Sequence, residues 1–421
     1  MKVRILFLLM VLLISIVAMS QILTLTLWTA PNPYQDMFWR QIVSEWNKTH
    51  PDIQIKWSEI PAAGSSEESI LTAIASGRQP DICDNIFTGF GEELVDSNVL
   101  VPLDSFPDFQ SLISLRHMET IIKHWDFDGH YYVFPEYVNP MLIWWRKSIL
   151  QKYGFDQPPR TYTDLYELAQ KVDIPHRRYA LLFYTGPVWS DRWFDFIMYY
   201  YAASGGQPYV NTQAQVALFD NEYGKEVANF IYTLFKNGYS SVDLASPPFE
   251  SGAVVGCTEG PWNIPYEQTQ FPDIYKDVVV SPPLVPDNYP KDKPIYTFAD
   301  SKGMVIFKST KAKEDAAWEF MKWVYSNPNN DVLWIKLTGM PPARSDLLTN
   351  PIFAPYMKDN PIFAAYAKYV PYAVPPALSS KTVDIQQAMT TYLVEPLIYL
   401  KSTPDQALQQ CVSQIDNILF Q

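Results

Sequence analysis

The feature that most constrains the fold is an alternation of strand and helix patterns that starts after the first twenty residues. Residues 22–28 alternate apolar side chains with threonine, which is typical of a strand with one covered face. Residues 38–46 then place their apolar side chains at helical spacing. A strand, a helix ending at Gly77 and a third strand are expected at 53–57, 70–77 and from Pro80 to Ile82. Short links between such elements imply an α/β fold with a parallel sheet wound with helices.

Ligands of wound parallel sheets bind beyond the carboxyl ends of the strands. Trp28 and Thr29 end the first predicted strand, and Asp84 and Asn85 follow the third. We therefore expect these residues at the mouth of a binding site, with Tyr34 in the loop after the first strand.

Four more helices are expected later in the chain. They cover residues 161–172, 224–235, 313–324 and the stretch from Thr403 onwards. Thr161 and Thr403 are each followed three residues later by Asp or Gln, which favours an N-terminal capping box. Prolines cluster at 282–294 and 341–376, where they favour extended surface connections and crossings between lobes.

The first twenty residues have the pattern of a secretory signal peptide. Lys2 and Arg4 precede an uncharged apolar run at 5–17, and small residues follow up to Ser20. The alternative is an uncleaved anchor, but a membrane span takes ~20 apolar residues and this run is shorter. We expect cleavage after Ser20 and a soluble protein in the periplasm or outside the cell.

Composition narrows the possible partners. Acidic residues outnumber basic ones by 45 to 32, and the net charge of -13 disfavours binding to nucleic acid or to anionic membranes. Cys83, Cys257 and Cys411 lie far apart and exclude a disulfide framework or a zinc ribbon. The five histidines form no metal-binding pair, so no metal and no cofactor are expected. Aromatic residues make up 15% of the chain, which favours a ligand with faces that rings can cover.

Several sequence motifs occur in one order along the chain. They include AIASGRQPDI (73–82), WDFDGHYYVFPE (125–136), FESGAVVGCTEGPW (249–262), STKAKEDAAWEFMKWV (309–324) and GMPPAR (339–344). In this order the chain resembles the extracellular solute-binding proteins of ABC sugar importers, the carbohydrate-type, maltodextrin-binding-like family.

The resemblance implies a two-lobe periplasmic-binding-protein fold, each lobe a mostly parallel sheet flanked by helices. Hinge strands would cross near 134–138, 286–296 and 338–341. The amino-terminal lobe would then comprise 21–135 with 290–338, and the carboxy-terminal lobe 136–289 with 339–421. It also implies a monomer without enzymatic activity. This monomer would capture a sugar, preferably an oligosaccharide, by hinge closure and deliver it to the membrane permease subunits of an ABC transporter.

A sugar ring presents apolar C–H faces and a rim of hydroxyls that each need a partner when buried. Aromatic rings and short polar side chains in predicted loops suit both features. The candidate ligand-binding residues are Trp28, Thr29, Tyr34, Asn85, Glu136, Trp189, Trp193, Glu259, Trp262, Asp300 and Arg344. Trp28 is also compatible with a core position, Trp189 and Trp193 with one face of a buried helix, and Arg344 with a salt bridge across the lobes.

Two other classes of function stay open. A receptor for a peptide or another non-sugar solute would need a cation for the ligand carboxylate, which Arg192 or Arg344 could supply. An exported glycoside hydrolase would also be rich in rings and carboxylates. The chain has no HExxH or GxSxG motif and no P-loop, which favours binding without catalysis.

Overall fold

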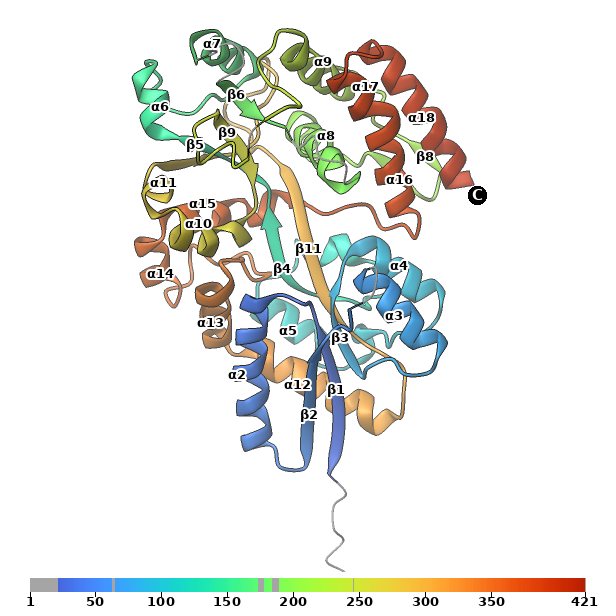
Figure 1. Ribbon diagram of the computed structural model, residues 1–421. Coiled ribbons are helices and arrows are strands. Elements are labelled where there is room, and N and C mark those ends of the chain that lie inside the picture. Colours follow the sequence, from blue (N-terminus) through green and yellow to red (C-terminus); the bar gives the residue numbers. More distant parts are fainter. Residues whose placement is uncertain (1–21, 63–64, 173–177, 184–188, 245, 421) are drawn as a thin grey trace, which may run out of the picture.

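The structure is a computed structural model that describes residues 22–420, apart from 63–64, 173–177, 184–188, 245 and the side chains of 189–192. Two lobes lie one above the other, and extended segments run between them (Figure 1). Each lobe contains a β-sheet flanked by helices, which confirms the predicted α/β two-lobe fold.

The sheet of the first lobe has the strand order β12-β11-β3-β1-β2, and β4 pairs with β11. Its strands are β1 (Leu23–Thr29), β2 (Ile53–Glu59), β3 (Ile82–Ile86), β4 (Phe134–Pro140), β11 (Thr297–Ile306) and β12 (Ala373–Val374). As predicted, β1 is parallel to both β2 and β3. Strand β11 is antiparallel to β3 and β4. Both β1 and β2 run towards the second lobe, so their carboxyl ends face it (Figure 1).

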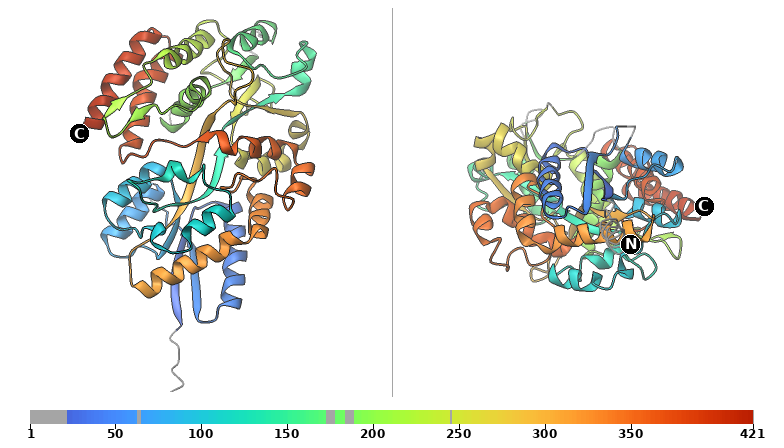
Figure 2. Two further views of the ribbon diagram at one scale, coloured as in Figure 1. Left: turned by 180° about the vertical axis from the view of Figure 1, so that it is seen from behind. Right: turned by 90° about the horizontal axis from the view of Figure 1, so that it is seen from below.

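Helices cover this first sheet. They are α2 (Pro33–Thr49), α3 (Ser66–Ala75), α4 (Thr88–Asp96), α5 (Phe109–Leu115), α12 (Lys311–Ser326) and α13 (Pro328–Thr338). Seen from behind, α12 lies across the lobe (Figure 2). Asn32 caps α2 by accepting from the backbone N–H groups of Tyr34 and Gln35, and Pro33 is the first helical residue. The helix thus starts within the stretch that the sequence suggested as a loop.

The second sheet has the order β10-β5-β9-β6. Its strands are β5 (Leu142–Arg146), β6 (Tyr179–Leu182), β9 (Val254–Glu259) and β10 (Val278–Ser281), and β7 (Val210–Asn211) pairs with β8 (Val216–Ala217) beside it. Only β6 and β9 are parallel, so the expected mostly parallel sheet is wrong for this lobe. Strand β5 enters from the first lobe and runs opposite to both of its neighbours, β9 and β10, so two of the three pairings in this sheet are antiparallel.

Helices of the carboxy-terminal half complete the structure. They are α6 (Lys147–Lys152), α7 (Tyr162–Val172), α8 (Trp189–Ser204), α9 (Glu222–Lys236), α10 (Ile264–Gln270), α11 (Pro272–Lys276), α14 (Ala354–Asp359), α15 (Pro361–Tyr369), α16 (Thr382–Met389), α17 (Glu395–Ile398) and α18 (Pro404–Phe420). The four later helices predicted from sequence correspond to α7, α9, α12 and α18, and the capping boxes at Thr161 and Thr403 are present.

Three extended segments connect the lobes near the predicted places. Strand β4 leads into β5, and the chain returns from β10 to β11. Residues 341–343 lie along β4, where Val138 N–H donates to the Pro341 carbonyl (3.0 Å) and Ala343 N–H to the Glu136 carbonyl (2.9 Å). Strand β12, from the stretch expected in the carboxy-terminal lobe, pairs with β11 of the first sheet. The lobe boundaries themselves stay a prediction.

Candidate ligand site between the lobes

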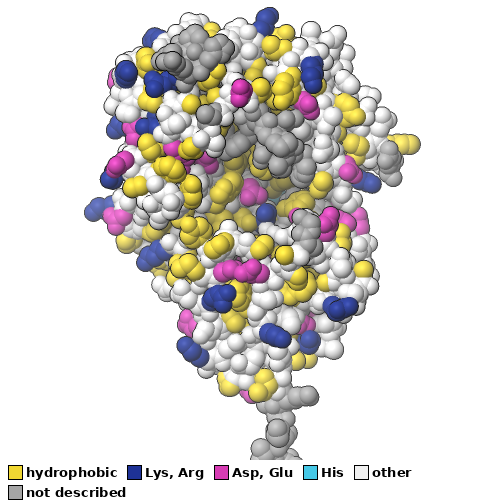
Figure 3. Space-filling model, viewed as in Figure 1, with side chains coloured by type: hydrophobic (Ala, Val, Ile, Leu, Met, Phe, Trp, Pro, Cys, Tyr) yellow, Lys and Arg dark blue, Asp and Glu magenta, His cyan; other side chains and the backbone are white. Residues whose placement is uncertain are grey.

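A cavity of about 500 Å³ lies where the two lobes face each other. Its lining residues are Ser65, Glu67, Glu68 and Phe87 from the first lobe, Phe298, Asp300, Ser301 and Lys302 from β11, and Phe194, Pro376, Val383 and Gln386 from the carboxy-terminal half. The space-filling view shows a hollow between the lobes with hydrophobic and acidic side chains around it (Figure 3). Small-molecule sites typically have volumes of ~300–1,000 Å³, so the cavity can hold a solute of one or a few sugar rings.

Strand β11 forms one wall of this cavity. Side chains two residues apart on a strand share a face, and Phe298, Asp300 and Lys302 all line the cavity. Asp300 and Lys302 are half-buried, whereas Phe298 is buried against α8. The predicted ligand residue Asp300 therefore lies in the cavity.

Three aromatic rings contribute apolar surface. Phe87 follows β3, Phe194 belongs to α8 and Phe298 to β11. The rings of Phe194 and Phe298 are 4.9 Å apart between centroids and tilted by 32°. Rings from both lobes thus face one space, as a ligand with apolar faces requires.

The predicted residues at the strand ends gather at one edge of the first sheet. Trp28 pairs with Cys83 and is half-buried against the core. Thr29 is fully buried, and its hydroxyl accepts from the Trp57 indole N–H (2.9 Å). Asn85 has a left-handed φ of 66°, and its amide donates to the Ser66 hydroxyl (3.1 Å) at the start of α3. Tyr34 lies half-buried in the first turn of α2.

Two carboxyl groups lie buried beneath this edge. Asp84 is fully buried, and Glu136 on β4 is 3% exposed. Burial raises the pKa of Asp84 to about 7, although the backbone N–H of Ala30 donates to it (2.7 Å). Burial, and then the nearby Asp84, raise the pKa of Glu136 well above its ordinary value. The predicted residue Glu136 thus lies under the crevice and does not line its cavity.

The second lobe supplies Glu259 and Trp262. Glu259 ends β9, and Trp262 lies in the single turn η3 (Pro261–Asn263) that follows. The Trp262 ring is half-buried and contacts the hydrophobic cores of both lobes. A Cβ on Gly260 would lie 2.2 Å from this ring, so glycine is required where the indole folds over the backbone. Trp262 therefore lies at the junction of the lobes.

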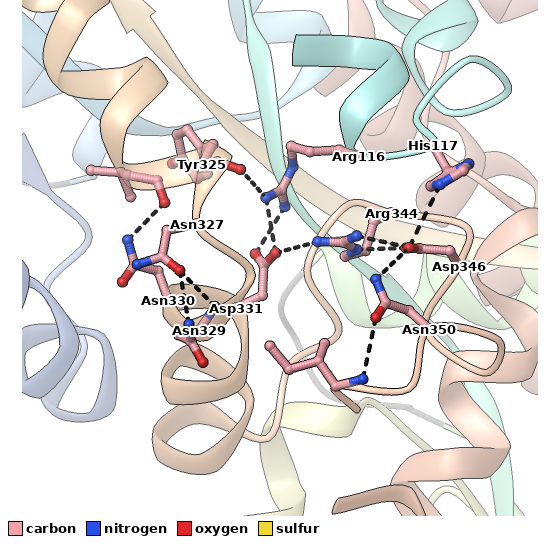
Figure 4. Close-up of polar contacts among 12 residues, drawn as sticks. Arg116, His117, Tyr325, Asn327, Asn329, Asn330, Asp331, Arg344, Asp346 and Asn350 are labelled. Atoms are coloured by element: carbon pink, nitrogen blue, oxygen red, sulfur yellow. Dashed lines mark hydrogen bonds and ion pairs between the residues drawn. The ribbon is translucent and has the colours of Figure 1, made fainter. Parts of the chain in front are cut away.

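Two predicted residues lie elsewhere. Trp193 is fully buried in the core of the second lobe, where its indole N–H donates to the Met389 sulfur (3.2 Å) and its ring packs edge-on against Phe298. Arg344 is 4% exposed and pairs with Asp331 (2.7 Å) and Asp346 (2.6 Å) (Figure 4). Core packing and ion pairing occupy these two side chains in the arrangement described here, and their contact with a ligand stays a prediction. The Trp189 side chain lies outside the described residues.

Sequence reasoning missed Phe87, Phe194, Glu67, Glu68 and Lys302 as cavity residues. The period-two spacing of Phe298, Asp300 and Lys302 could have indicated Lys302. Nothing local marks Phe194, because α8 is aromatic along most of its length. Its exposure depends on which side of the helix meets the other lobe.

In the part of the chain that the structure describes, no group of three or more His, Cys, Asp or Glu side chains could hold a metal ion. Across residues 22–420, with the gaps given above, no helix is long and apolar enough to span a bilayer.

The chain is similar to several known proteins. It is 22% identical to the maltotriose-binding protein of Pyrococcus abyssi over 329 residues, which are 77% of this chain and 67% of the relative. It is 23% identical over 343 residues to the arabinooligosaccharide-binding protein of Halalkalibacterium halodurans, covering 78% and 73% of the two chains. The crystal structure of an uncharacterized protein from Listeria monocytogenes matches with a TM-score of 0.87 and 33% identity, over 94% of this chain and 100% of that one.

A family model also matches most of the chain. The model describes bacterial extracellular solute-binding proteins and aligns with residues 41–380, which include the second sheet and every strand of the first sheet except β1. The chain therefore belongs to the family of bacterial extracellular solute-binding proteins.

Proposed function

We propose that this protein captures a carbohydrate, preferably an oligosaccharide, between its lobes by hinge closure and delivers it unchanged to the permease subunits of an ABC transporter. One observation carries the proposal. In a chain of this family, rings from both lobes and carboxylates from the first lobe surround one cavity of about 500 Å³. The names of two relatives, which bind maltotriose and arabinooligosaccharides, support a sugar as the solute.

The cavity chemistry suits a polyol better than a peptide. Asp300, Glu67 and Glu68 accept hydrogen bonds from hydroxyls, and Lys302 donates to them. Three carboxylates against one ammonium disfavour a free carboxylate on the ligand, because like charges repel at short distance. The Phe194 and Phe298 rings offer apolar surface for the C–H faces of a sugar.

The extended segments between the lobes give closure a physical basis. Hinge closure around a ligand changes the backbone at a few residues and leaves each lobe intact. Pro135 through Pro140 on β4 and the antiparallel stretch 341–343 beside it offer such residues. We also propose that residues 1–20 direct export and are removed. Amino-terminal sequencing of the exported protein should find a chain that starts at Gln21.

A thermal-shift panel tests the function. The mature protein from Gln21 should be heated with malto- and arabino-oligosaccharides, with their monosaccharides, and with peptides of similar size. A ligand at 100 times its dissociation constant adds ~2.7 kcal/mol to stability, so a binding oligosaccharide should raise Tm by several degrees. Chromatography of the sugar after long incubation should show unchanged chain length. A shift with peptides alone, or cleavage of the sugar, would contradict the proposal.

A further inference from the structure

Asp84 and Glu136 lie on two strands that flank β11. Strand β3 carries Asp84 and pairs with β11 at Cys83 and Val305, while β4 carries Glu136 and pairs with β11 at Pro135 and Gly303. A Cβ on Gly303 would lie 2.4 Å from the Phe134 carbonyl oxygen, so β4 and β11 approach very closely at this point. The two acids thus lie on either side of the strand that forms one wall of the cavity.

Most of their carboxylate oxygens have no protein partner. The backbone N–H of Ala30 donates to Asp84 Oδ1 (2.7 Å). Asp84 Oδ2 and both Glu136 oxygens have no hydrogen-bond partner among the residues that the structure describes. Burying an ionised carboxylate without a partner is very costly, whereas a protonated carboxyl avoids most of that cost.

The guanidinium groups near Glu136 already have partners. Arg116 pairs through both terminal nitrogens with Asp331 at 3.0 Å each. Asp331 also accepts from Arg344 (2.7 Å), and Arg344 pairs with Asp346 (2.6 Å) (Figure 4). This cluster contains two guanidinium groups and two carboxylates, so its charges balance without Glu136.

The other groups around the two acids come from several elements. They are Asp36 and Trp39 on α2, Asp300 and Lys302 on β11, Tyr325 on α12, Arg116 after α5, and Tyr137 on β4. Trp39 and Lys302 lower the pKa of Asp84, and Tyr325 and Arg116 lower that of Glu136, whereas Asp36 raises the pKa of Asp84. Burial dominates, since it is the largest cause of the raised pKa of both acids.

We propose that Asp84 and Glu136 together hold one proton in the arrangement described here, and that losing it loosens the packing of β3, β11 and β4 and weakens solute capture. The proton belongs to the pair and not to one residue. The part concerning capture rests on the proposed function, whereas the bound proton does not.

The sign of the pH dependence follows from the raised pKa values. An unfolded Asp or Glu loses its proton near pH 4, whereas in the folded protein burial raises the pKa of Asp84 to about 7 and that of Glu136 well above its ordinary value. Stability should therefore fall as pH rises from about 4 through 7. If the pair is exposed to water when the crevice is open, the affinity for the solute should also fall as pH rises. For one proton, this fall is at most ~tenfold per pH unit.

The experiment uses the mature chain, the variants Asp84→Asn and Glu136→Gln, their double variant, and the control Asp273→Asn, whose side chain is 93% exposed on α11. Infrared spectroscopy of the unliganded proteins should show the carbonyl band of a protonated carboxyl at pH 6.5. The double variant should lose the part of this band that comes from the pair and keep only the part from Glu267, whose pKa burial raises to about 8. In the wild type and in the control alike, the part from the pair should be present at pH 6.5 and weaken as pH rises. Melting temperatures from pH 5 to 9 should fall less steeply in the double variant than in the wild type.

Binding then tests the link to capture. For a sugar identified by thermal shift, log Kd of the wild type and of Asp273→Asn should rise with pH between 6.5 and 8.5, and the slope should flatten in Asp84→Asn. The bound proton would be refuted, even if the sugar binds, by a wild type that lacks the pair's infrared band. It would also be refuted if the melting temperatures of the wild type and the double variant depended on pH in the same way. A pH-independent Kd would refute its link to capture.

If no sugar binds, the proposed function fails. The ligand-free spectra and melting curves then still show whether the pair holds a proton. If the variants do not fold, the wild-type band and its titration still decide it.

Discussion

At the scale of single residues, Asp300 is a residue that was predicted from sequence to bind the ligand and that lines the cavity in the structure. It is half-buried on β11, two positions from both Phe298 and Lys302. Hydrogen bonds from neutral donors to a carboxylate contribute about 1.5–3 kcal/mol, and an amide accepts more weakly. A ligand hydroxyl bonded to Asp300 should therefore depend strongly on its charge.

We expect Asp300→Asn to weaken binding of the preferred sugar about tenfold, measured by isothermal titration calorimetry. Asp273→Asn removes a carboxylate from the exposed surface of α11 and should leave the affinity unchanged. Equal affinities for wild type and Asp300→Asn would place the solute elsewhere in the crevice.

Trp193 shows that a tryptophan predicted to contact the ligand can instead belong to the hydrophobic core. Its ring is fully buried against Phe298, Tyr209 and the Met389 sulfur. Trp39, Trp46, Trp125, Trp144 and Trp145 are likewise sealed from solvent. Much of the high aromatic content therefore builds the two cores.

Trp193→Ala should destabilise the protein by ~3–5 kcal/mol, because it removes a fully buried ring and leaves a cavity. Trp323→Ala, at a half-buried ring on α12, should cost clearly less. Urea unfolding followed by circular dichroism measures both free energies. A loss of sugar affinity without a loss of stability in Trp193→Ala would restore its predicted role as a ligand residue.

At the scale of elements, capping residues fix where helices begin. Thr403 precedes α18, and the Gln406 side chain accepts from the Thr403 backbone N–H (3.2 Å), while Gln406 N–H donates to the Thr403 hydroxyl (3.4 Å). Leu408, Cys411 and Ile415 on this helix are buried in the second core. The capping box and the apolar face were both readable from sequence, since each depends on residues close in the chain.

Thr403→Ala should lower stability by about 1 kcal/mol, the usual cost of losing an N-cap. Ser413→Ala, at an exposed interior position of α18, should be neutral or slightly stabilising because alanine favours helices. Chemical denaturation of the two variants gives the comparison. A larger loss in Ser413→Ala than in Thr403→Ala would contradict the assigned role of the cap.

At the scale of the whole molecule, the proposed capture requires one lobe to rotate against the other about the extended segments between them. The cavity lies between elements of both lobes, so bound solute contacts both and favours the closed arrangement. Closure should therefore depend on a ligand that touches each lobe.

Small-angle X-ray scattering should show a smaller radius of gyration when the preferred oligosaccharide saturates the protein. A sugar that gives no thermal shift should leave the radius unchanged. Tight binding without any compaction would exclude hinge closure as the mechanism of capture.

The sequence by itself determined the order of strands and helices, the parallel start of the first sheet, the capping boxes and the resemblance to a two-lobe binding fold. These features depend on side-chain periodicity and on hydrogen bonds between residues a few positions apart. Asp300 could be predicted as a cavity residue because a short acid suits a ligand site, although it lies on strand β11 and not in the expected loop.

Only the tertiary structure decided which rings face the crevice and which charges are already paired. Trp193 is buried by Met389, 196 positions away, and Arg116 binds Asp331 across 215 positions. The antiparallel pairings of β5 likewise join it to β9 and β10, two strands that come much later in the chain. Burial and ion pairing depend on such distant contacts, and no local pattern specifies them.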